Sequence, residues 1–456
     1  MTEEAIIELF AVLKEPLEKW ARETGFVKRK GTLTPHDFLA LMTVGQMGMK
    51  HPSLAGMVAA IEANISRVAL HQRFTANAAA FLYKCLNFIL NQQVQQAVPV
   101  QTEVLDHFNR VFIVDSSSWD VNEKLRGVLP GSGGSASDAS CKIQVAYEYI
   151  KGELAFLDVT PGILPDNRFT DNLPALLSVN DLLLIDQGYF KLDTFAAILA
   201  KGAFFLTRFL VSTTLTNADS GEAIDLRKTL KSLRANTGEI PVVMGPQAAK
   251  GVTARLICLR VSQQVAEKRR KRLIKDAAKK GRTVSELHLE LCAWTMLVTN
   301  IPQAWLPLEM CRALYTLRWQ IELLFKQLKS ILRIHNSDTA NEHRLRCELY
   351  GKMIIAVLVH RLHAAANSAS WNTSRIEISM DKFYKRIQER AFTLLAHLRQ
   401  GLRRTAVFLR AELKSFTKHC VKSKQNSRMT TLEMLEAQVD PALSVRSTTE
   451  SLGLLA

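Results

Sequence analysis

The stretch YTLRWQIELLFKQLKS, residues 315–330, decides how this sequence is interpreted. It contains neither Gly nor Pro, and Pro307 precedes it at a position that suits the first turn of a helix. We therefore predict one helix over residues 308–332, with an apolar stripe along one side. The helical period places three charged side chains within roughly 60° of Tyr315, beside that stripe. They are Arg318, Glu322 and Lys329.

This spacing has a functional and a structural interpretation. A carboxylate at the edge of a buried face is a candidate catalytic group, because the core holds it while one side stays open. Arg318 and Glu322 are also an i,i+4 pair, which stabilises a solvated helix by only a few tenths of a kcal/mol. Amphipathic helices with charged flanks are common, so this helix alone does not decide between the two.

The positive charge of the chain is concentrated in two segments. The 456 residues carry a formal net charge of +16. Residues 268–282 hold nine Lys or Arg and one Asp, residues 385–428 hold twelve Lys or Arg and two Glu, and the remainder is close to neutral. One basic run is usually a solvated surface. Two such runs favour a polyanionic partner, and nucleic acid in particular.

Cysteine usage and hydropathy indicate a cytoplasmic protein. The seven cysteines are scattered singly without a CxxC pair, which argues against a disulfide framework and against a zinc finger. The N-terminal stretch MTEEAIIELF is acidic, whereas a signal peptide is basic. No apolar run approaches the ~18 residues that a membrane span needs. We therefore expect no contact with a membrane.

The first hundred residues have a helical pattern. Residues 51–74 predict two helices with a break at Ala63-Asn64, and Ser66 is a possible N-cap of the second. This pair resembles a helix-turn-helix loosely, and a small helical bundle fits the spacing equally well.

From residue 110 onward, strand patterns alternate with helical ones. A helix is predicted over residues 191–202. Strand-like runs occupy residues 110–121, 141–150, 153–162, 181–190, 203–211 and 294–301. One strand is predicted to end at Asp115 and another at Asp186. Ligand sites gather at strand ends in α/β sheets, so these positions are candidate site residues.

Asp115, Asp186 and Glu322 offer hard oxygen ligands without a His or Cys cluster nearby. Such ligands favour magnesium or manganese over zinc. Two ions about 3.5–4 Å apart can activate a nucleophilic oxygen and stabilise a leaving oxygen at a phosphodiester. Spacing alone does not select these aspartates from four neighbours of equal acidity, which are Asp120, Asp158, Asp166 and Asp181.

Three motifs resemble one family. The pattern Y-x2-R-x3-E-x6-K at residues 315–329 is similar to the signature of bacterial insertion-sequence transposases with an Asp-Asp-Glu active site. IVDSSS resembles the strand that carries the family's first Asp, and IDQGYF resembles the block that carries the second. The motifs stand in family order, with a long insertion between the second Asp and the Glu.

The resemblance implies a fold and a domain organisation. The fold class is α/β, with a ribonuclease H-like mixed sheet, a mostly β insertion, and helical N- and C-terminal regions. The expected segments are a helical DNA-binding domain (1–105), the first part of the catalytic core (106–205), an inserted mostly β domain with the basic run (206–290), the second part of the core (291–365), and a helical basic region (366–456).

The resemblance also implies roles for individual residues. Asp115, Asp186 and Glu322 would ligate two Mg²⁺ ions, with Mn²⁺ as a possible substitute. The expected DNA contacts are Tyr315, Arg318, Lys329, Trp294, Arg208, Arg269, Arg270 and Arg272, the last three from the basic run. Trp294 would stack on a flipped base; a core aromatic on a strand is the alternative.

The expected function is cut-and-paste DNA transposition by phosphodiester hydrolysis and strand transfer. The partner is double-stranded DNA at the element's terminal repeats and at the target, held by a homodimer that is nucleoid-associated in a bacterial cytoplasm. Two alternatives remain open on the same core. One is a metal-dependent DNA nuclease, and the other is an inactive DNA-binding regulator.

Overall fold

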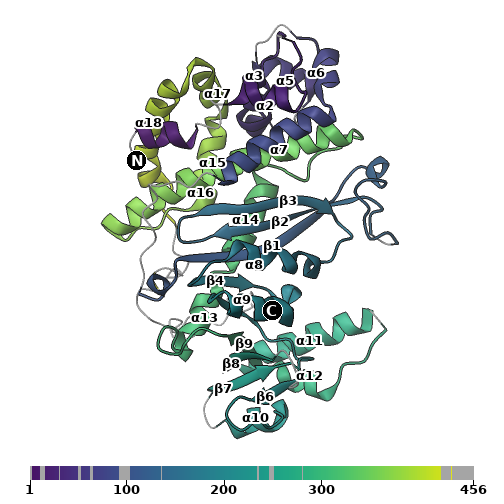
Figure 1. The fold of residues 1–456 in the computed structure, drawn as a ribbon, viewed down its shortest axis with the longest axis vertical. Helices are drawn as coiled ribbons and strands as arrows, with labels where there is room; N and C mark the ends of the chain where they lie inside the picture. Colours follow the sequence, from purple (N-terminus) through teal and green to yellow (C-terminus); the bar gives the residue numbers. More distant parts are fainter. Residues whose placement is uncertain are drawn as a thin grey trace. The chain divides into compact units, whose positions relative to one another are not determined.

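The computed structural model divides into two compact units (Figure 1). Unit 1 comprises Met1–Gln101, Asp115–Pro165 and Gln320–Ser423, and unit 2 comprises Thr102–Val114, Asp166–Trp319 and Lys424–Ala456. The structure describes residues 3–10, 16–29, 31–49, 53–61, 65–91, 103–134, 136–233, 236–245, 251–279, 281–422 and 433. The sequence that follows residue 433 and the predicted break at Ala63-Asn64 lie outside these residues.

Unit 2 is built on a mixed sheet. Its strands, in spatial order, are the first half of β1 (Arg110–Asp120), then β4 (Asp181–Ile185), β5 (Phe204–Arg208), β9 (Trp294–Thr299), β8 (Val252–Arg260), β7 (Thr237–Met244) and β6 (Leu215–Asn217). The pairs β1–β4 and β4–β5 are parallel, and the later pairs are antiparallel. Every residue of β4 is buried, as expected for an apolar strand inside a parallel sheet.

Helices connect and flank these strands. They are α8 (Leu173–Leu176), α9 (Leu192–Ala200), α10 (Leu226–Ser232), α11 (Gln263–Lys279), α12 (Glu286–Leu291) and α13 (Leu308–Thr316). The predicted helix over residues 191–202 is confirmed by α9, which Gly202 follows with a φ of +67°. In Figure 1, α11 and α12 lie beside strands β7 to β9.

The inserted segment 206–290 needs a correction. It was predicted to be mostly β, and it does contain β6, β7 and β8. It also contains α10, α11 and α12, so it is mixed α/β. The basic run is the reason, because Lys, Arg, Glu and Ala are good helix formers and no Gly or Pro interrupts residues 263–279. The run therefore forms α11 rather than a loop between strands.

Unit 1 contains a hairpin and most of the helices. The second half of β1 is followed by β2 (Ser140–Glu148) and β3 (Glu153–Pro161), which pair antiparallel around a turn at Gly152. The helices are α1 (Glu3–Leu9), α2 (Leu17–Glu23), α3 (Pro35–Ala40), α4 (Gln46–Gly48), α5 (Leu54–Ile61), α6 (Arg67–Arg73), α7 (Ala76–Asn91), α14 (Trp319–Ser330), α15 (Glu342–Ser374), α16 (Met380–Glu389), α17 (Ala391–Gln400) and α18 (Leu402–His419), together with the π-helical η2 (Leu41–Gly45). The mixed sheet and the helical terminal regions expected of the ribonuclease H-like class are confirmed.

The central helix of unit 1 is α15, and α7 lies beside part of it (Figure 1). Gly351 lets α15 approach η2 very closely, because a Cβ at that position would lie 2.0 Å from the carbonyl oxygen of Met42. The predicted N-cap is also confirmed, since Ser66 Oγ accepts a hydrogen bond from Ala69 N at 3.1 Å at the start of α6. Whether α5 and α6 act as a helix-turn-helix stays a prediction.

Two further sequence expectations concern cysteines and membranes. All seven cysteines lie in the described ranges as free thiols. In the part of the chain that the structure describes, no helix combines the length and the apolar character that a membrane crossing requires.

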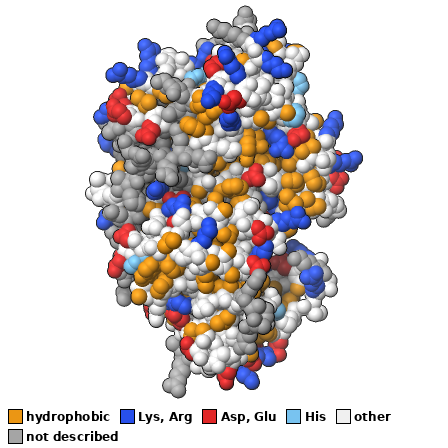
Figure 2. Space-filling view, in the orientation of Figure 1, with side chains coloured by type: hydrophobic (Ala, Val, Ile, Leu, Met, Phe, Trp, Pro, Cys, Tyr) orange, Lys and Arg blue, Asp and Glu red, His pale blue; other side chains and the backbone are white. Residues whose placement is uncertain are grey.

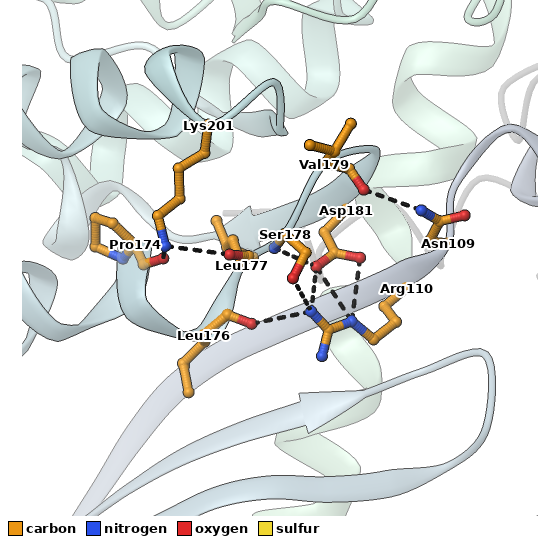
Figure 3. A network of polar contacts seen from close by, with 9 residues as sticks. All are labelled: Asn109, Arg110, Pro174, Leu176, Leu177, Ser178, Val179, Asp181 and Lys201. Carbon is orange, nitrogen blue, oxygen red and sulfur yellow. Dashed lines mark hydrogen bonds and ion pairs between the residues drawn. The ribbon is translucent and has the colours of Figure 1, made fainter. Parts of the chain in front are cut away.

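An ion pair fixes the starts of β1 and β4 (Figure 3). Arg110 Nε lies 3.1 Å from both carboxylate oxygens of Asp181, and Arg110 Nη2 lies 2.5 Å from Oδ2. The Asp181 carboxylate is fully buried and also accepts a hydrogen bond from Ser178 N at 2.7 Å. Arg110 and Asp181 are Cα partners in the β1–β4 ladder. The pair therefore fixes the register that is used below to place the candidate site.

Two buried histidines on α15 lead to a prediction about acid stability. The ring centroids of Tyr147 and Tyr384 lie 5.7 and 5.4 Å from the ring centroid of His360. The His363 Nε2–H donates a hydrogen bond to Ile378 O at 2.9 Å. Burial lowers the pKa of His360 to about 3 and that of His363 to about 4, from an ordinary value of 6.5. Both groups are neutral in the folded chain at any pH above those values.

We expect unit 1 to lose stability as the pH falls below 6.5, because the unfolded chain then binds protons that the folded chain does not. The loss at pH 5 is about 2 kcal/mol for each histidine. Chemical denaturation at pH 7 and pH 5 measures it. His363→Gln should reduce the difference between the two pH values, whereas His71→Gln, at an exposed position, should leave it unchanged. If both variants lose the same free energy of unfolding between pH 7 and pH 5, the assignment is wrong.

Candidate active site

In three neighbouring parallel strands of unit 2, the last paired residues directly precede chemically active ones. Val114 of β1 is the partner of Ile185 in β4, and Ile185 is the partner of Thr207 in β5. The residues that follow these three are Asp115, Asp186 and Arg208. Equivalent positions on parallel strands point to the same side of a sheet. The register thus supports the two aspartates that spacing alone did not select.

The predicted end of β1 at Asp115 is wrong. The strand continues to Asp120, although its recorded pairing with β4 stops at Val114. Beyond Val114 the chain is bonded to residues of unit 1. Ser140 Oγ donates a hydrogen bond to Trp119 O at 3.1 Å, and Val121 N donates one to Ala139 O at 3.1 Å. Polar residues can extend a strand when a neighbouring segment satisfies the backbone. Asp115 Oδ1 accepts a hydrogen bond from Ser116 N at 2.8 Å.

Asp186 stands where the sequence placed it, directly after β4. It precedes the short 3₁₀ helix η6 (Gln187–Tyr189), and Gln187 Nε2 donates to Phe209 O at 2.9 Å. The Tyr315 hydroxyl, from α13, lies 3.3 Å from Ile185 O and 3.4 Å from Asp186 Oδ1. Burial, reinforced by Asp186, raises the pKa of Tyr315 above its ordinary value. Tyr315 is therefore a neutral hydrogen-bond donor next to Asp186.

The predicted single helix over residues 308–332 is also wrong, because it is interrupted. Helix α13 ends at Thr316 and α14 begins at Trp319. Between them the amides of Leu317 and Arg318 bond three residues back, to Leu314 O and Tyr315 O, both at 3.1 Å. These bonds tighten the turn. The four polar residues therefore do not share one helical face, and the chain passes from unit 2 to unit 1 directly after Trp319.

The two later members of the motif lie in unit 1 on α14. Lys329 Nζ donates to Ser118 O in β1 at 3.2 Å, and burial lowers the pKa of this ammonium group. Glu322 is half-buried. It lies seven residues before Lys329, which is close to two helical turns, so both side chains are on one side of α14. That side contacts β1 only three residues after Asp115.

Unit 2 gathers arginines near Asp186 that the sequence separates widely. Arg269 of α11 donates to Trp294 O at 3.1 Å and to Thr295 Oγ1 at 3.0 Å. Burial, with the positive charges of Arg208 and Arg312, lowers the pKa of Arg269 to about 10. The charges of Arg318 and Arg208 also act on Tyr315. Sequence reasoning missed Arg312, and its only signal was a position one helical turn before Tyr315.

Trp294 is the first residue of β9, as predicted, and is half-exposed. Arg260 is its Cα partner in β8, and the Arg260 guanidinium carbon lies 5.8 Å from the centroid of the indole ring. Arg318 stands over Tyr315 in a similar way, at 6.0 Å. Arg260 was likewise missed by the sequence interpretation. Its place opposite the half-exposed Trp294 is visible only once the β8–β9 register is known.

The other two arginines predicted as DNA contacts lie along α11. Arg270 Nε donates to Leu289 O at 3.0 Å, and Arg272 is exposed, 3.8 Å from Asp276. Their role stays a prediction. On the face seen in Figure 2, Lys and Arg side chains stand among Asp and Glu side chains and do not form one continuous patch. Within the described residues, no group of three or more His, Cys, Asp or Glu side chains is arranged so that it could hold a metal ion.

Comparison with known proteins gives a consistent result. Residues 106–358 match the family described as "Transposase DDE domain". The chain is 27% identical over 406 residues to the transposase of insertion sequence element IS231E from Bacillus thuringiensis subsp. finitimus, with 84% of each chain covered. It is 27% identical over 441 residues to the transposase of IS1151 from Clostridium perfringens, covering 92% of this chain and 93% of the relative.

A search of solved structures found the piggyBac transposase in a synaptic complex with hairpin DNA. The TM-score is 0.47 and the identity 12%, over 94% of this chain and 87% of that one.

Proposed function

This chain belongs to the transposases with a DDE domain, and we propose that it cuts and joins DNA at the ends of an insertion sequence. Asp115, Asp186 and Glu322 are the proposed catalytic carboxylates, and residues 315–329 carry the proposed Tyr-Arg-Glu-Lys signature. The observation that supports the proposal is the strand register, in which Val114 and Ile185, the residues directly before Asp115 and Asp186, are partners.

The position of Glu322 is supported by contacts within unit 1. Lys329 touches Ser118. Asp115 precedes Ser118 by three strand residues, a rise of about 10 Å, and Glu322 precedes Lys329 by seven helical residues, also a rise of about 10 Å. If α14 follows β1 in the same direction, Glu322 arrives beside Asp115.

By type the three side chains suit divalent cations that prefer oxygen, such as Mg²⁺ or Mn²⁺, because all are carboxylates, although the described side chains are not gathered into a metal-binding group. When bound, such ions activate the attacking oxygen and stabilise the leaving oxygen at a phosphodiester. The residues of the chain would hold and orient the DNA. Tyr315 offers a neutral hydroxyl next to Asp186, while Arg318 and Lys329 bind phosphate oxygens.

The proposed partner is double-stranded DNA, held at two element ends by a homodimer. Trp294 would stack on a base, with Arg208, Arg269, Arg270 and Arg272 along the DNA. The five segments 1–105, 106–205, 206–290, 291–365 and 366–456 remain the proposed domain organisation, with DNA recognition by the first. Two DNA ends must be aligned during transposition, and this requirement favours a dimer.

Strand transfer tests the proposal. Purified protein, Mg²⁺, a duplex that carries the element's own terminus together with its flanking DNA, and a supercoiled plasmid are incubated together. We expect nicks at the terminus, followed by plasmid molecules joined to the duplex. Cleavage without joined product would favour the nuclease alternative. Binding to the duplex without cleavage or joining would favour the inactive regulator, and either result would reject transposition by this chain.

A further inference from the structure

The basic residues of the segment 385–428 divide into two sets in unit 1. The first set is neutralised by a carboxylate of the same unit. Arg386 and Arg390 both pair with Glu412 of α18, at 3.5 and 3.3 Å. The Glu412 side chain is only 14% exposed, so these two arginines compensate a largely buried negative charge. Their positive charge serves the packing of α16 to α18.

The second set lies on one side of α18, which packs against α1 and α17 (Figure 1). At about 100° per residue, the exposed Arg and Lys side chains of this helix fall within an arc of about 120°. We call this arc the α18 basic face, and its members are Arg403, Arg404, Arg410 and Lys418. The buried side chains lie on the opposite side of the helix, and they are Thr405, Ala406, Leu409 and Phe416.

Most of the charge on the α18 basic face is not neutralised by unit 1. Among the described residues, neither Arg403 nor Lys418 has a carboxylate within ion-pair distance. Arg404 Nη1 donates to the neutral amide oxygen of Gln400 at 2.7 Å. Arg410 alone pairs with an acid, Glu3 of α1, at 2.9 Å. The face therefore keeps a net positive charge and attracts a polyanion.

The length of the face favours double-stranded DNA as that polyanion. Arg403 and Lys418 are fifteen residues apart, a rise of about 22 Å along the helix. The major groove of DNA is about 12 Å wide, so the face is long enough to reach phosphates on both sides of it. DNA presents one negative charge per about 1.7 Å of its axis, and arginine binds phosphate oxygens in bidentate pairs.

We propose that the α18 basic face binds the phosphate backbone of double-stranded DNA without regard to sequence. This surface is additional to the contacts proposed for residues 315–329 and for α11. The inference rests on the proposed function, because the DNA that it holds is the DNA that the chain cuts and joins. Phosphate contacts fix the position of a duplex and carry no sequence information, so the face contributes affinity and leaves recognition of the element's terminus to other residues.

Removal of two charges from the face tests the proposal. Arg403→Gln combined with Arg404→Gln should reduce the slope of log affinity against log salt by about two, because each lost phosphate contact removes about 0.9. Affinity for a long duplex of arbitrary sequence should fall by about tenfold to a hundredfold at physiological salt. Arg403→Lys combined with Arg404→Lys keeps both charges and should restore the wild-type slope. Filter binding over a series of salt concentrations measures both quantities.

Two control pairs remove the same number of charges elsewhere. Arg386→Gln with Arg390→Gln leaves Glu412 without a positive partner, so it should lower the melting temperature and keep the salt slope. Lys228→Gln with Lys231→Gln, at exposed positions of α10, should change neither. If the first control does not fold, the α10 pair decides the comparison.

The inference is overturned if the Arg403 and Arg404 glutamine pair keeps the wild-type slope, or if the α10 pair lowers the slope as much. It is also overturned if the glutamine pair changes the oligomeric state in gel filtration at an unchanged slope, because the face would then be an interface between two copies of the chain. Wild-type protein that binds no DNA rejects the proposed function itself. Wild-type binding, cutting and joining with an unaffected glutamine pair rejects only this inference.

Discussion

Asp186→Asn is expected to lower the rate of DNA cleavage by at least about a thousandfold, because a lost cation ligand removes several kcal/mol of transition-state stabilisation. DNA binding should persist, since the amide oxygen of Asn can still accept the hydrogen bond from the Tyr315 hydroxyl, now 3.4 Å from Asp186 Oδ1. Asp115→Asn and Glu322→Gln should behave in the same way. Single-turnover cleavage of the element's terminus, with binding measured separately, gives the two quantities.

The matched controls use carboxylates on the same elements or next to them. Asp120 is exposed at the end of β1, five residues after Asp115, and Glu309 is exposed at the start of α13. Asp120→Asn and Glu309→Gln should cut at nearly the wild-type rate. The catalytic assignment is wrong if Glu322→Gln retains activity. It is also wrong if Asp120→Asn is as inactive as Asp115→Asn, because the strand register would then have selected the wrong aspartate.

Local patterns predicted the elements that carry the aspartates. The buried run DLLLI ends at Ile185 in the structure as in the sequence interpretation, so Asp186 was placed correctly. The end of β1 was predicted wrongly, because the strand continues through Ser116 to Asp120 and bonds there to residues of unit 1. Strand propensity describes a segment, whereas the length of a strand depends on a neighbour that is distant in sequence. The preference for Asp115 over Asp120 came from the resemblance, the register supports it, and it stays a prediction.

The interrupted helix shows a second limit. Residues 308–332 contain no helix breaker, and their apolar period is continuous. The interruption at Leu317 and Arg318 coincides with the passage of the chain between units, which no local pattern records. The explanation by a common helical face was wrong, and the roles of the four motif residues stay a prediction. Tyr315 instead reaches Asp186 through a contact between residues 129 positions apart.

The surroundings of Arg269 were invisible for the same reason. Arg269 meets the start of β9 only through the packing of α11. The basic run drew attention to Arg269 as a surface charge. Its burial and its bonds to Trp294 and Thr295 follow from the tertiary structure alone.

The second large effect concerns stability. Arg110→Met should destabilise unit 2 by about 3 kcal/mol, because it leaves the fully buried Asp181 carboxylate without its positive partner. We take the low end of the range for buried pairs, since Arg110 is itself 35% exposed and Ser178 N still donates to Asp181. Chemical denaturation of the wild type and the variant measures the difference. Combining Arg110→Met with Asp181→Asn should recover much of the loss, because no unpaired charge then remains buried.

The control is the surface pair Lys191–Asp171, whose nitrogen and oxygen are also 2.5 Å apart but whose side chains are 35% and 67% exposed. Lys191→Met should cost less than about 1 kcal/mol, because water screens and replaces an exposed ion pair. If Arg110→Met costs no more than this control, the network in Figure 3 does not hold β1 against β4. If Arg110→Met costs more than the control, total cleavage activity should fall in proportion to the fraction of folded protein. The cleavage rate per folded molecule should then stay near that of the wild type. A lower rate per folded molecule would instead mean that Arg110 takes part in the reaction itself. Arg110 lies four residues before Val114, the residue that precedes Asp115.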